Sequence, residues 1–571
     1  MNQEKTYRYW LEHVKTEQER EELLALSPTE IEERFSAPLD FGTAGMRGVI
    51  GLGTGNMNVY TVMQATKGVA DYINALGEGF AARGVAIAYD TRRLSREFAY
   101  ATARILATEG VSVFLFDNVR PVPMLSFAVR HLGCFMGVMI TASHNPKEYN
   151  GYKVYGEDGA QLSPEATEKV VGYIRKVPDF GLKLKTKAAN FALKRPNDRI
   201  EFIGKKVDKA YFKQILKLSL SPRAVKRKGK SIKLVYTPVH GSGYMPVTHV
   251  LKKLGIRAGV VVEQIAPDPE FSTVQVPNPE LAETLTLGIK RANEISADVV
   301  FGTDPDCDRL GVALRNERNV FETLTGNQVG VLLLDYILKR LEEEGDLPAN
   351  GAVVKSIVST DLAKVICARY GVTLCETLVG FKFIGEKIKE WEANGEHTFL
   401  FGFEESCGYL RGTHARDKDA VVASMLMAEL VCYYADKGRS VFDVLSNLGK
   451  KYGYYEDKVI SLSFAGADGK QKMSAFMDKI RKKNPKSLGK PVIALRDYLA
   501  GARTDANGGK TPLDLPKSDI IYFELEGGGR ACLRPSGTEP KLKVYLTAVG
   551  KTRDAAIEDL DAIETAVRKL L

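Results

Sequence analysis

The chain has 571 residues, too many for one hydrophobic core, and a length of this order predicts three to five domains of roughly 150 residues each. Hydrophobic residues make up 44% and charged residues 26%, as in ordinary soluble globular proteins. The chain opens on polar and charged residues, and no apolar run approaches the ~20 residues that span a bilayer. The sequence therefore argues against a secretory signal and a membrane span.

The formal net charge of +9 arises from 80 basic against 71 acidic residues. Part of the excess lies in two basic runs, KLKTK at 183–187 and RAVKRKGK at 223–230. Neither run has aromatic residues interspersed, so we interpret both as solvated loops or linkers and expect no nucleic-acid partner. A mild positive field suits a small phosphorylated substrate.

The seven cysteines are scattered and form no CxxC pair. This pattern favours reduced thiols and a cytoplasmic location over a disulfide framework. We interpret Cys307 and Cys407, which fall inside candidate motifs, as small packing residues and not as nucleophiles.

The N-terminal arm is predicted to be helical. SPTE, from Ser27 to Glu30, has the pattern of a capping box with Pro28 at the first helical position.

A strand–helix–strand pattern then occurs three times along the chain. Its first strands are GVAIAYD (84–90), SIKLVYTP (231–238) and GAVVKSIVS (351–359). Each is followed by an amphipathic helix that ends in Gly and by a second strand, VSVFLF, AGVVVEQ or VTLCET. This βαβ order predicts three related α/β domains with mostly parallel sheets.

From about Tyr452 the pattern changes to alternating strands around helices, which predicts a smaller α+β domain at the C-terminus. A ligand that touches all the domains would lie in a cleft between them. The predicted domains are 1–195 (with the helical arm), 196–320, 321–445 and 446–571.

The loop GTDPDCDRLG, at 302–311, follows an apolar strand and carries Asp304, Asp306 and Asp308 at every second residue. In an extended loop these carboxylates would face one way, and a divalent, oxygen-ligated metal would relieve their repulsion. An EF-hand does not fit, because Arg309 and Arg315 stand where that motif needs Gly and Glu. The alternative is a salt-bridged surface turn.

Three further loops carry candidate residues. TASHNPKEYNGYK (141–153) places Ser143 and His144 after the apolar run CFMGVMI, although a polar surface turn would look similar. GFEESCGY (402–409) presents a carboxylate and a hydroxyl suited to sugar hydroxyls, and FGTAGMRG (41–48) is a Gly-rich loop that bears Arg47. Each of these two could equally be a plain turn.

The stretch RPSGTEPKLKVY, from Arg534 to Tyr545, has the composition of a phosphate-binding loop and is predicted to begin beyond a strand end. Arg534 offers a planar fork that matches phosphate, Ser536 and Thr538 add hydroxyls, and Gly537 lets backbone N–H groups approach closely. A plain turn is the alternative.

Taken together, these loops limit the reaction types that the chain could catalyse. No GxSxG elbow surrounds Ser143, so the sequence does not support acyl transfer. A serine beside a metal loop instead indicates phosphoryl transfer through Ser143.

In these four loops, TASHNP, GTDPDCDR, GFEESCG and RPSGTEP, the chain resembles the α-D-phosphohexomutases, closest to the phosphoglucomutase branch. The loops occur in the family order across essentially the whole chain. The resemblance implies a four-domain α/β protein with one active site in a central cleft. It also implies interconversion of glucose 1-phosphate and glucose 6-phosphate, with Mg²⁺ as cofactor and glucose 1,6-bisphosphate as intermediate and activator.

The resemblance also implies residue roles. Ser143 would be the phosphoserine, with Asp304, Asp306 and Asp308 as Mg²⁺ ligands and a phosphoserine oxygen completing the metal site. The residues implied at the reacting phosphate and sugar are Arg47, His144, Lys153 (a proton acceptor), Arg309 and Lys418. The residues implied to bind the sugar hydroxyls are Glu404 and Ser406, and those implied to hold the non-reacting phosphate are Arg534, Ser536, Gly537 and Thr538.

Phe403 and Cys407 vary the family's sugar loop, so phosphomannomutase and phosphopentomutase activities stay open. A rival from another class is an aspartyl phosphatase with Asp304 as nucleophile, but Asp308 stands where such enzymes prefer Thr, and TASHNP is left unexplained. A sugar-phosphate sensor without catalysis is a third hypothesis. The expected partners are small sugar phosphates, with no membrane, and the oligomeric state stays open.

Overall fold

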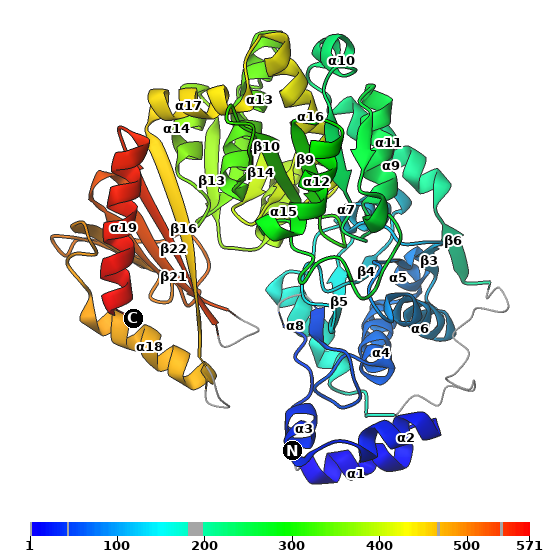
Figure 1. Ribbon diagram of the computed structural model, residues 1–571. Coiled ribbons are helices and arrows are strands. Elements are labelled where there is room, and N and C mark those ends of the chain that lie inside the picture. The colour runs from blue at the N-terminus through cyan, green and yellow to red at the C-terminus, as the bar shows by residue number, and fades with distance from the viewer. Residues whose placement is uncertain (1–2, 43–44, 181–197, 465–468, 537–540, 571) are drawn as a thin grey trace. The chain divides into compact units, whose positions relative to one another are not determined.

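The computed structural model describes residues 3–42, 45–180, 198–464, 469–536 and 541–570 (Figure 1). The chain divides into two compact units. Unit 1 comprises Met1–Thr325, Ile384–Phe399 and Ser406–Tyr433, and unit 2 comprises Gly326–Phe383, Leu400–Glu405 and Tyr434–Leu571. The four predicted domain boundaries remain predictions.

Unit 1 begins with the helical arm, which consists of α1 (Gln3–His13), α2 (Glu17–Leu24) and α3 (Pro28–Phe35). The predicted capping box is confirmed: the Ser27 hydroxyl accepts from the Glu30 N–H, and the Ser27 N–H donates to the Glu30 carboxylate at 2.9 Å. Trp10 and Phe35 lie in a buried cluster that also includes Tyr60, so the arm is packed onto the rest of the unit.

The first sheet of unit 1 has the strand order β1-β5-β4-β2-β3-β6. Its strands are β1 (Gly45–Val49), β2 (Val85–Tyr89), β3 (Val113–Phe116), β4 (Met136–Ile140), β5 (Tyr149–Tyr155) and β6 (Ile200–Ile203). The strands β4, β2, β3 and β6 run parallel, as the βαβ order predicted for β2 and β3, whereas β5 is antiparallel to both of its neighbours. The sheet is therefore mixed.

Helices cover this sheet. They are α4 (Val59–Leu76), α5 (Glu78–Arg83), α6 (Ser95–Thr108), α7 (Val122–Leu132) and α8 (Pro164–Ile174). The helices α6 and α7 both pack against β2 and β4, and α4 packs against α6 and α8. Strands β2 and β4 are buried along their whole length, as a near-continuous apolar run requires in a covered parallel sheet.

The second sheet of unit 1 has the order β11-β10-β9-β7-β8, with β7, β8 and β9 parallel and the other pairs antiparallel. Its strands are β7 (Leu234–Thr237), β8 (Ala258–Val260), β9 (Val299–Thr303), β10 (Leu310–Arg315) and β11 (Phe321–Leu324). The helical elements around it are α9 (Lys205–Lys217), α10 (Pro222–Lys228), α11 (Tyr244–Leu254), η1 (Val262–Gln264), η2 (Ala282–Leu285) and α12 (Thr286–Glu294).

Two sequence predictions in this region were wrong in detail. The basic run at 223–230 is not a loop, because most of it forms α10, where Ala224 and Val225 are buried and Arg223, Lys226 and Arg227 are exposed. The stretch AGVVVEQ is only partly a strand, since the chain turns into η1 at Val262. The other basic run, at 183–187, lies outside the described residues.

Unit 2 has an α/β part and an antiparallel part. The first contains the parallel strands β12 (Gly351–Ser356) and β13 (Thr373–Thr377), with helices α13 (Gly326–Glu344), α14 (Leu362–Arg369) and α17 (Val441–Tyr452). Three elements contribute residues to both units: α15 (Phe381–Asn394), β14 (Thr398–Glu404) and α16 (Ala420–Asp436). The short strand β15 (Gly408–Leu410) belongs to unit 1.

The antiparallel part is a sheet in the order β16-β22-β21-β20-β17-β18-β19. Its elements are β16 (Tyr454–Ser463), α18 (Gly469–Lys483), β17 (Val492–Asp497), β18 (Ala502–Asp505), β19 (Lys510–Pro512), β20 (Ile521–Leu525), η3 (Glu526–Gly528), β21 (Arg530–Pro535), β22 (Lys541–Gly550) and α19 (Arg553–Leu570). α19 packs against β22 and β16. The predicted change of architecture near Tyr452 is confirmed, because β16 starts at Tyr454.

A search of the described helices finds none that is both long and apolar enough to cross a membrane.

Candidate active site

Ser143 lies in the loop that leaves the buried end of β4. Its backbone N–H donates to the Thr141 hydroxyl at 2.8 Å, and that hydroxyl donates to Asp90 Oδ2 at 2.6 Å. Ser143 adopts a φ of 53°, in the left-handed region that non-glycine residues rarely occupy. Only 6% of the residue is exposed. The loop therefore presents a buried hydroxyl on a constrained backbone, which is a common feature of functional sites.

The carboxylates of Asp304, Asp306 and Asp308 form a buried cluster between β9 and β10. One oxygen from each lies within 4.8 Å of the others, and among the described residues this is the group of acidic, His or Cys side chains that could hold a metal ion. The predicted cluster is thus present, but the predicted extended loop is wrong. The segment is a tight turn, which Asp304 closes by accepting from the N–H groups of Asp308 and Arg309 at 3.0 Å each.

The cluster fits a divalent cation. Asp306 Oδ1 and Asp308 Oδ1 are buried and have no hydrogen-bond partner among the residues that the structure describes. Buried carboxylate oxygens without partners are costly unless a cation coordinates them. Asp304 Oδ2 lies beside them and accepts from the Ser143 hydroxyl at 2.9 Å. The donor set consists only of oxygen atoms, which Mg²⁺ and Ca²⁺ prefer.

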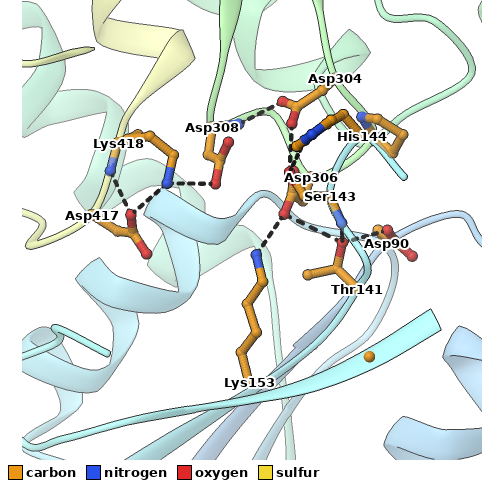
Figure 2. Close-up of polar contacts among 12 residues, drawn as sticks. Asp90, Thr141, Ser143, His144, Lys153, Asp304, Asp306, Asp308, Asp417 and Lys418 are labelled. Carbon is orange, nitrogen blue, oxygen red and sulfur yellow. Dashed lines mark hydrogen bonds and ion pairs between the residues drawn. The ribbon is translucent and has the colours of Figure 1, made fainter. Parts of the chain in front are cut away.

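Two lysines contact the cluster (Figure 2). Lys153, on β5, lies 3.1 Å from Asp306 Oδ2, and Lys418 lies 3.1 Å from Asp308 Oδ2 and from Asp417 Oδ1. These ammonium groups neutralise part of the buried negative charge.

The pKa values of the three carboxyl groups reflect burial and this charge pattern. Burial and the neighbouring carboxylates raise the pKa of Asp304 well above its usual range. Burial alone would also raise the pKa of Asp306, but Lys153 reverses the effect and lowers it to about 2. Burial and Asp306 raise the pKa of Asp308, against the opposing effect of Lys418.

The structure brings the other candidate residues of unit 1 to the same loops. His144 Nδ1 lies 3.2 Å from the Ser143 hydroxyl, and Arg47, exposed on β1, donates to the Asn145 side chain at 3.1 Å. Arg309 follows the aspartate turn and pairs with Glu280, with its Nε 3.9 Å from Asp308. Ser406 is half-buried and also belongs to unit 1.

Three of the other predicted residues lie in unit 2. Glu404 ends β14 and accepts from the Gly380 N–H at 2.7 Å. Arg534 is half-buried within β21, so the expectation that RPSGTEP begins beyond the strand was wrong. The N–H of Ser536 donates to the Lys541 carbonyl at 2.7 Å, which continues the pairing with β22. Gly537 and Thr538 lie outside the described residues.

The prediction missed Asp90, Thr141, Asp417 and Glu280. Asp90 could have been found, because it ends the strand GVAIAYD just as the other loops follow strands. Thr141 lies inside the predicted serine loop and Asp417 directly precedes Lys418, whereas Glu280 is recognisable only from its contact with the distant Arg309.

A buried serine hydroxyl beside a carboxylate cluster, on an α/β scaffold, is the arrangement expected of metal-dependent phosphoryl-transfer enzymes. This class of enzyme agrees with the protein-family models that the chain matches, which are those of phosphoglucomutase/phosphomannomutase. Their α/β/α domains I, II and III match residues 38–179, 209–317 and 325–452, and their C-terminal domain matches residues 495–562. The chain belongs to the phosphoglucomutase/phosphomannomutase family, whose members are intramolecular phosphotransferases.

Proteins with curated names are similar in sequence to this chain along nearly its whole length. A phosphoglucomutase from Staphylococcus epidermidis is 40% identical over 522 residues, covering 91% of this chain and 92% of the relative. A phosphoglucomutase from Staphylococcus aureus is 36% identical over 542 residues, covering 94% of each.

Solved structures share the fold. A putative phosphomannomutase from Thermus thermophilus has a TM-score of 0.65 at 23% identity, covering 94% of this chain and 99% of that one. Parafusin, a phosphoglucomutase from Paramecium, has a TM-score of 0.67 at 16% identity, covering 94% and 95%.

Proposed function

We propose that the protein is a phosphoglucomutase that interconverts glucose 1-phosphate and glucose 6-phosphate through a phosphorylated Ser143. The observation that carries this proposal is the 2.9 Å hydrogen bond from the Ser143 hydroxyl to Asp304 of the carboxylate cluster. The identity to curated phosphoglucomutases over more than nine-tenths of the chain supports it.

In the proposed reaction, the P–O bond to Ser143 Oγ breaks and a P–O bond forms to the free hydroxyl of glucose 1-phosphate. The sugar hydroxyl loses one proton and Ser143 Oγ gains one, so the step is balanced, and Lys153 and His144 are the candidates to exchange these protons. The product is glucose 1,6-bisphosphate. It turns end for end, and its other phosphoryl group returns to Ser143 by the reverse chemistry.

The proposed cofactor is Mg²⁺, held by Asp304, Asp306 and Asp308. When bound, it would neutralise charge on the oxygens of the transferring phosphoryl group. Arg309 and Arg47 add positive charge near Ser143, and Lys418 balances Asp308 and Asp417. In the proposed phosphoryl transfer, the protein therefore contributes mainly by positioning the reacting groups and neutralising their charge.

The remaining candidates bind the parts of the substrate that do not react. Glu404 and Ser406 are proposed to bind sugar hydroxyls, and Arg534, Ser536, Gly537 and Thr538 the non-reacting phosphate. We further propose that the enzyme works in the cytoplasm, a location that the seven free cysteines support.

The test of substrate class is a coupled assay that compares the 1-phosphates of glucose, mannose and ribose. We expect the highest kcat/KM for glucose 1-phosphate. A higher value for mannose or ribose would assign the chain to the phosphomannomutase or phosphopentomutase alternative.

Replacing Arg534 with alanine should lower kcat/KM about 10- to 150-fold, because charge-assisted hydrogen bonds to phosphate contribute roughly 1.5–3 kcal/mol. The variant should also release glucose 1,6-bisphosphate more often, and added bisphosphate should partly restore turnover. The measurement is the ratio of bisphosphate released to glucose 6-phosphate formed.

The matched control is Arg503→Ala, which removes an arginine of the same sheet that pairs with Glu524. It should leave the release ratio unchanged. An equal ratio in wild type and Arg534→Ala would refute the role assigned to Arg534.

A further inference from the structure

Ser143 depends on its surroundings for its conformation. A φ of 53° is unfavourable for serine, and such a backbone persists only where neighbouring groups hold it. The Thr141 hydroxyl fixes the N–H side of Ser143. A different group, from the loop after β2, fixes the carbonyl side.

That group is the guanidinium of Arg92. Its Nη2 donates to the carbonyl oxygens of Ser143 and Asn145, both at 2.5 Å. Its Nη1 donates to the carbonyl oxygens of Pro146 and Tyr149, at 2.8 and 3.0 Å. One side chain thus binds four carbonyl groups, three in the loop that carries Ser143 and one at the start of β5.

The side chain of Arg92 is fully buried and closely surrounded. Asp90 Oδ2 lies 3.4 Å from Nε, and the backbone N–H of Arg92 donates to the other Asp90 oxygen at 3.0 Å. The ring of Phe271 packs against the guanidinium, and its centroid lies 5.1 Å from Arg92 Cζ. Phe271 is itself buried, with a φ of 46°. Arg92 therefore has little freedom to move independently of the loop.

We propose that Arg92 is a positioning residue for Ser143. Arg92 sets the orientation of the Ser143 oxygen during phosphoryl transfer without touching the substrate. The inference rests on the proposed function, in which Ser143 carries the phosphoryl group. Each terminal nitrogen of the planar guanidinium donates to two carbonyl groups, whereas a lysine has all three of its N–H donors on one nitrogen and cannot reproduce this fork. If Arg92 had only a general structural role, its replacement would lower Tm, whereas loss of a positioning residue lowers kcat.

The test compares Arg92→Lys and Arg92→Met with wild type in the full-length enzyme with Mg²⁺. We expect kcat to fall about 10- to 100-fold in Arg92→Lys, because small displacements of a reacting group have effects of that order. The KM for glucose 1-phosphate should stay within about twofold. The rate at which glucose 1,6-bisphosphate phosphorylates dephosphorylated Ser143, followed by intact mass, should fall by a similar factor.

Two arginines of unit 1 provide controls. Arg93, the next residue, pairs with Glu270 on the surface, so Arg93→Met should retain wild-type kcat. Arg120 is a buried arginine that donates to both oxygens of Asp208 at 2.9 Å, so Arg120→Met should lower Tm and leave kcat of the folded enzyme near wild type.

The outcomes separate the two proposals. If wild type turns over and kcat of Arg92→Lys stays within about threefold of it, or falls no more than that of Arg120→Met, the positioning role is refuted. If wild-type Ser143 accepts no phosphate from the bisphosphate, the proposed function fails and the inference fails with it. If Arg92→Met does not fold, Arg92→Lys alone decides between these outcomes.

Discussion

Replacing Ser143 with alanine is expected to lower kcat on the order of 10³-fold or more, because the variant loses the oxygen that carries the phosphoryl group. Intact-mass and peptide mapping of the purified wild type should find phosphate on Ser143, and the variant should lack it. A steady-state assay with glucose 1-phosphate, glucose 1,6-bisphosphate and Mg²⁺ measures the loss.

Ser424 provides the control. It is a buried serine of α16 whose hydroxyl has no hydrogen-bond partner among the described residues, so Ser424→Ala removes a comparable hydroxyl without breaking a described hydrogen bond. We expect it to keep wild-type kcat. Retention of full turnover in Ser143→Ala, together with loss of activity in Asp304→Asn, would instead support the aspartyl phosphatase.

Chelation of divalent cations should abolish turnover, and added Mg²⁺ should restore it. Apart from the phosphoserine oxygen, the three carboxylates are the only protein ligands proposed, so the ion should exchange freely. Mg²⁺ should also raise Tm, because a ligand that binds only the folded state stabilises it. Differential scanning fluorimetry with and without EDTA measures this effect independently of activity.

Asp306→Asn should weaken the response to Mg²⁺ in both assays while the protein stays folded, because it also removes one of three repelling charges. Asp298→Asn is the matched control, since the Asp298 side chain is 70% exposed and pairs with Arg315. It should leave the Mg²⁺ response unchanged. Full activity and an unshifted Tm after exhaustive chelation would contradict the metal assignment.

The loops of the site could be predicted because each follows an apolar strand. The strand before Ser143 and the strand before Asp304 are buried runs of five residues, and polar residues directly after such strands are displayed at a sheet edge. The repeated βαβ order likewise predicted parallel strands at the centre of the first two sheets.

The remaining features depend on contacts between distant segments. The antiparallel pairing of β5 places Lys153 beside Met139, and nothing in the local pattern around Lys153 specifies that register. The tight turn at Asp304 arises from its own side-chain hydrogen bonds, which compete with the extended conformation that alternation suggests. The proposed role of Arg92 rests on four carbonyl acceptors in the segment 143–149, which is distant from Arg92 in the sequence.

In the proposed mechanism the phosphoryl group moves from Ser143 to a sugar and back, never to water. ³¹P NMR of glucose 1-phosphate incubated with the enzyme, Mg²⁺ and a trace of glucose 1,6-bisphosphate tests it most directly. We expect the glucose 1-phosphate signal to be replaced by that of glucose 6-phosphate, with total sugar phosphate constant. Growth of an inorganic phosphate signal in place of glucose 6-phosphate would contradict it.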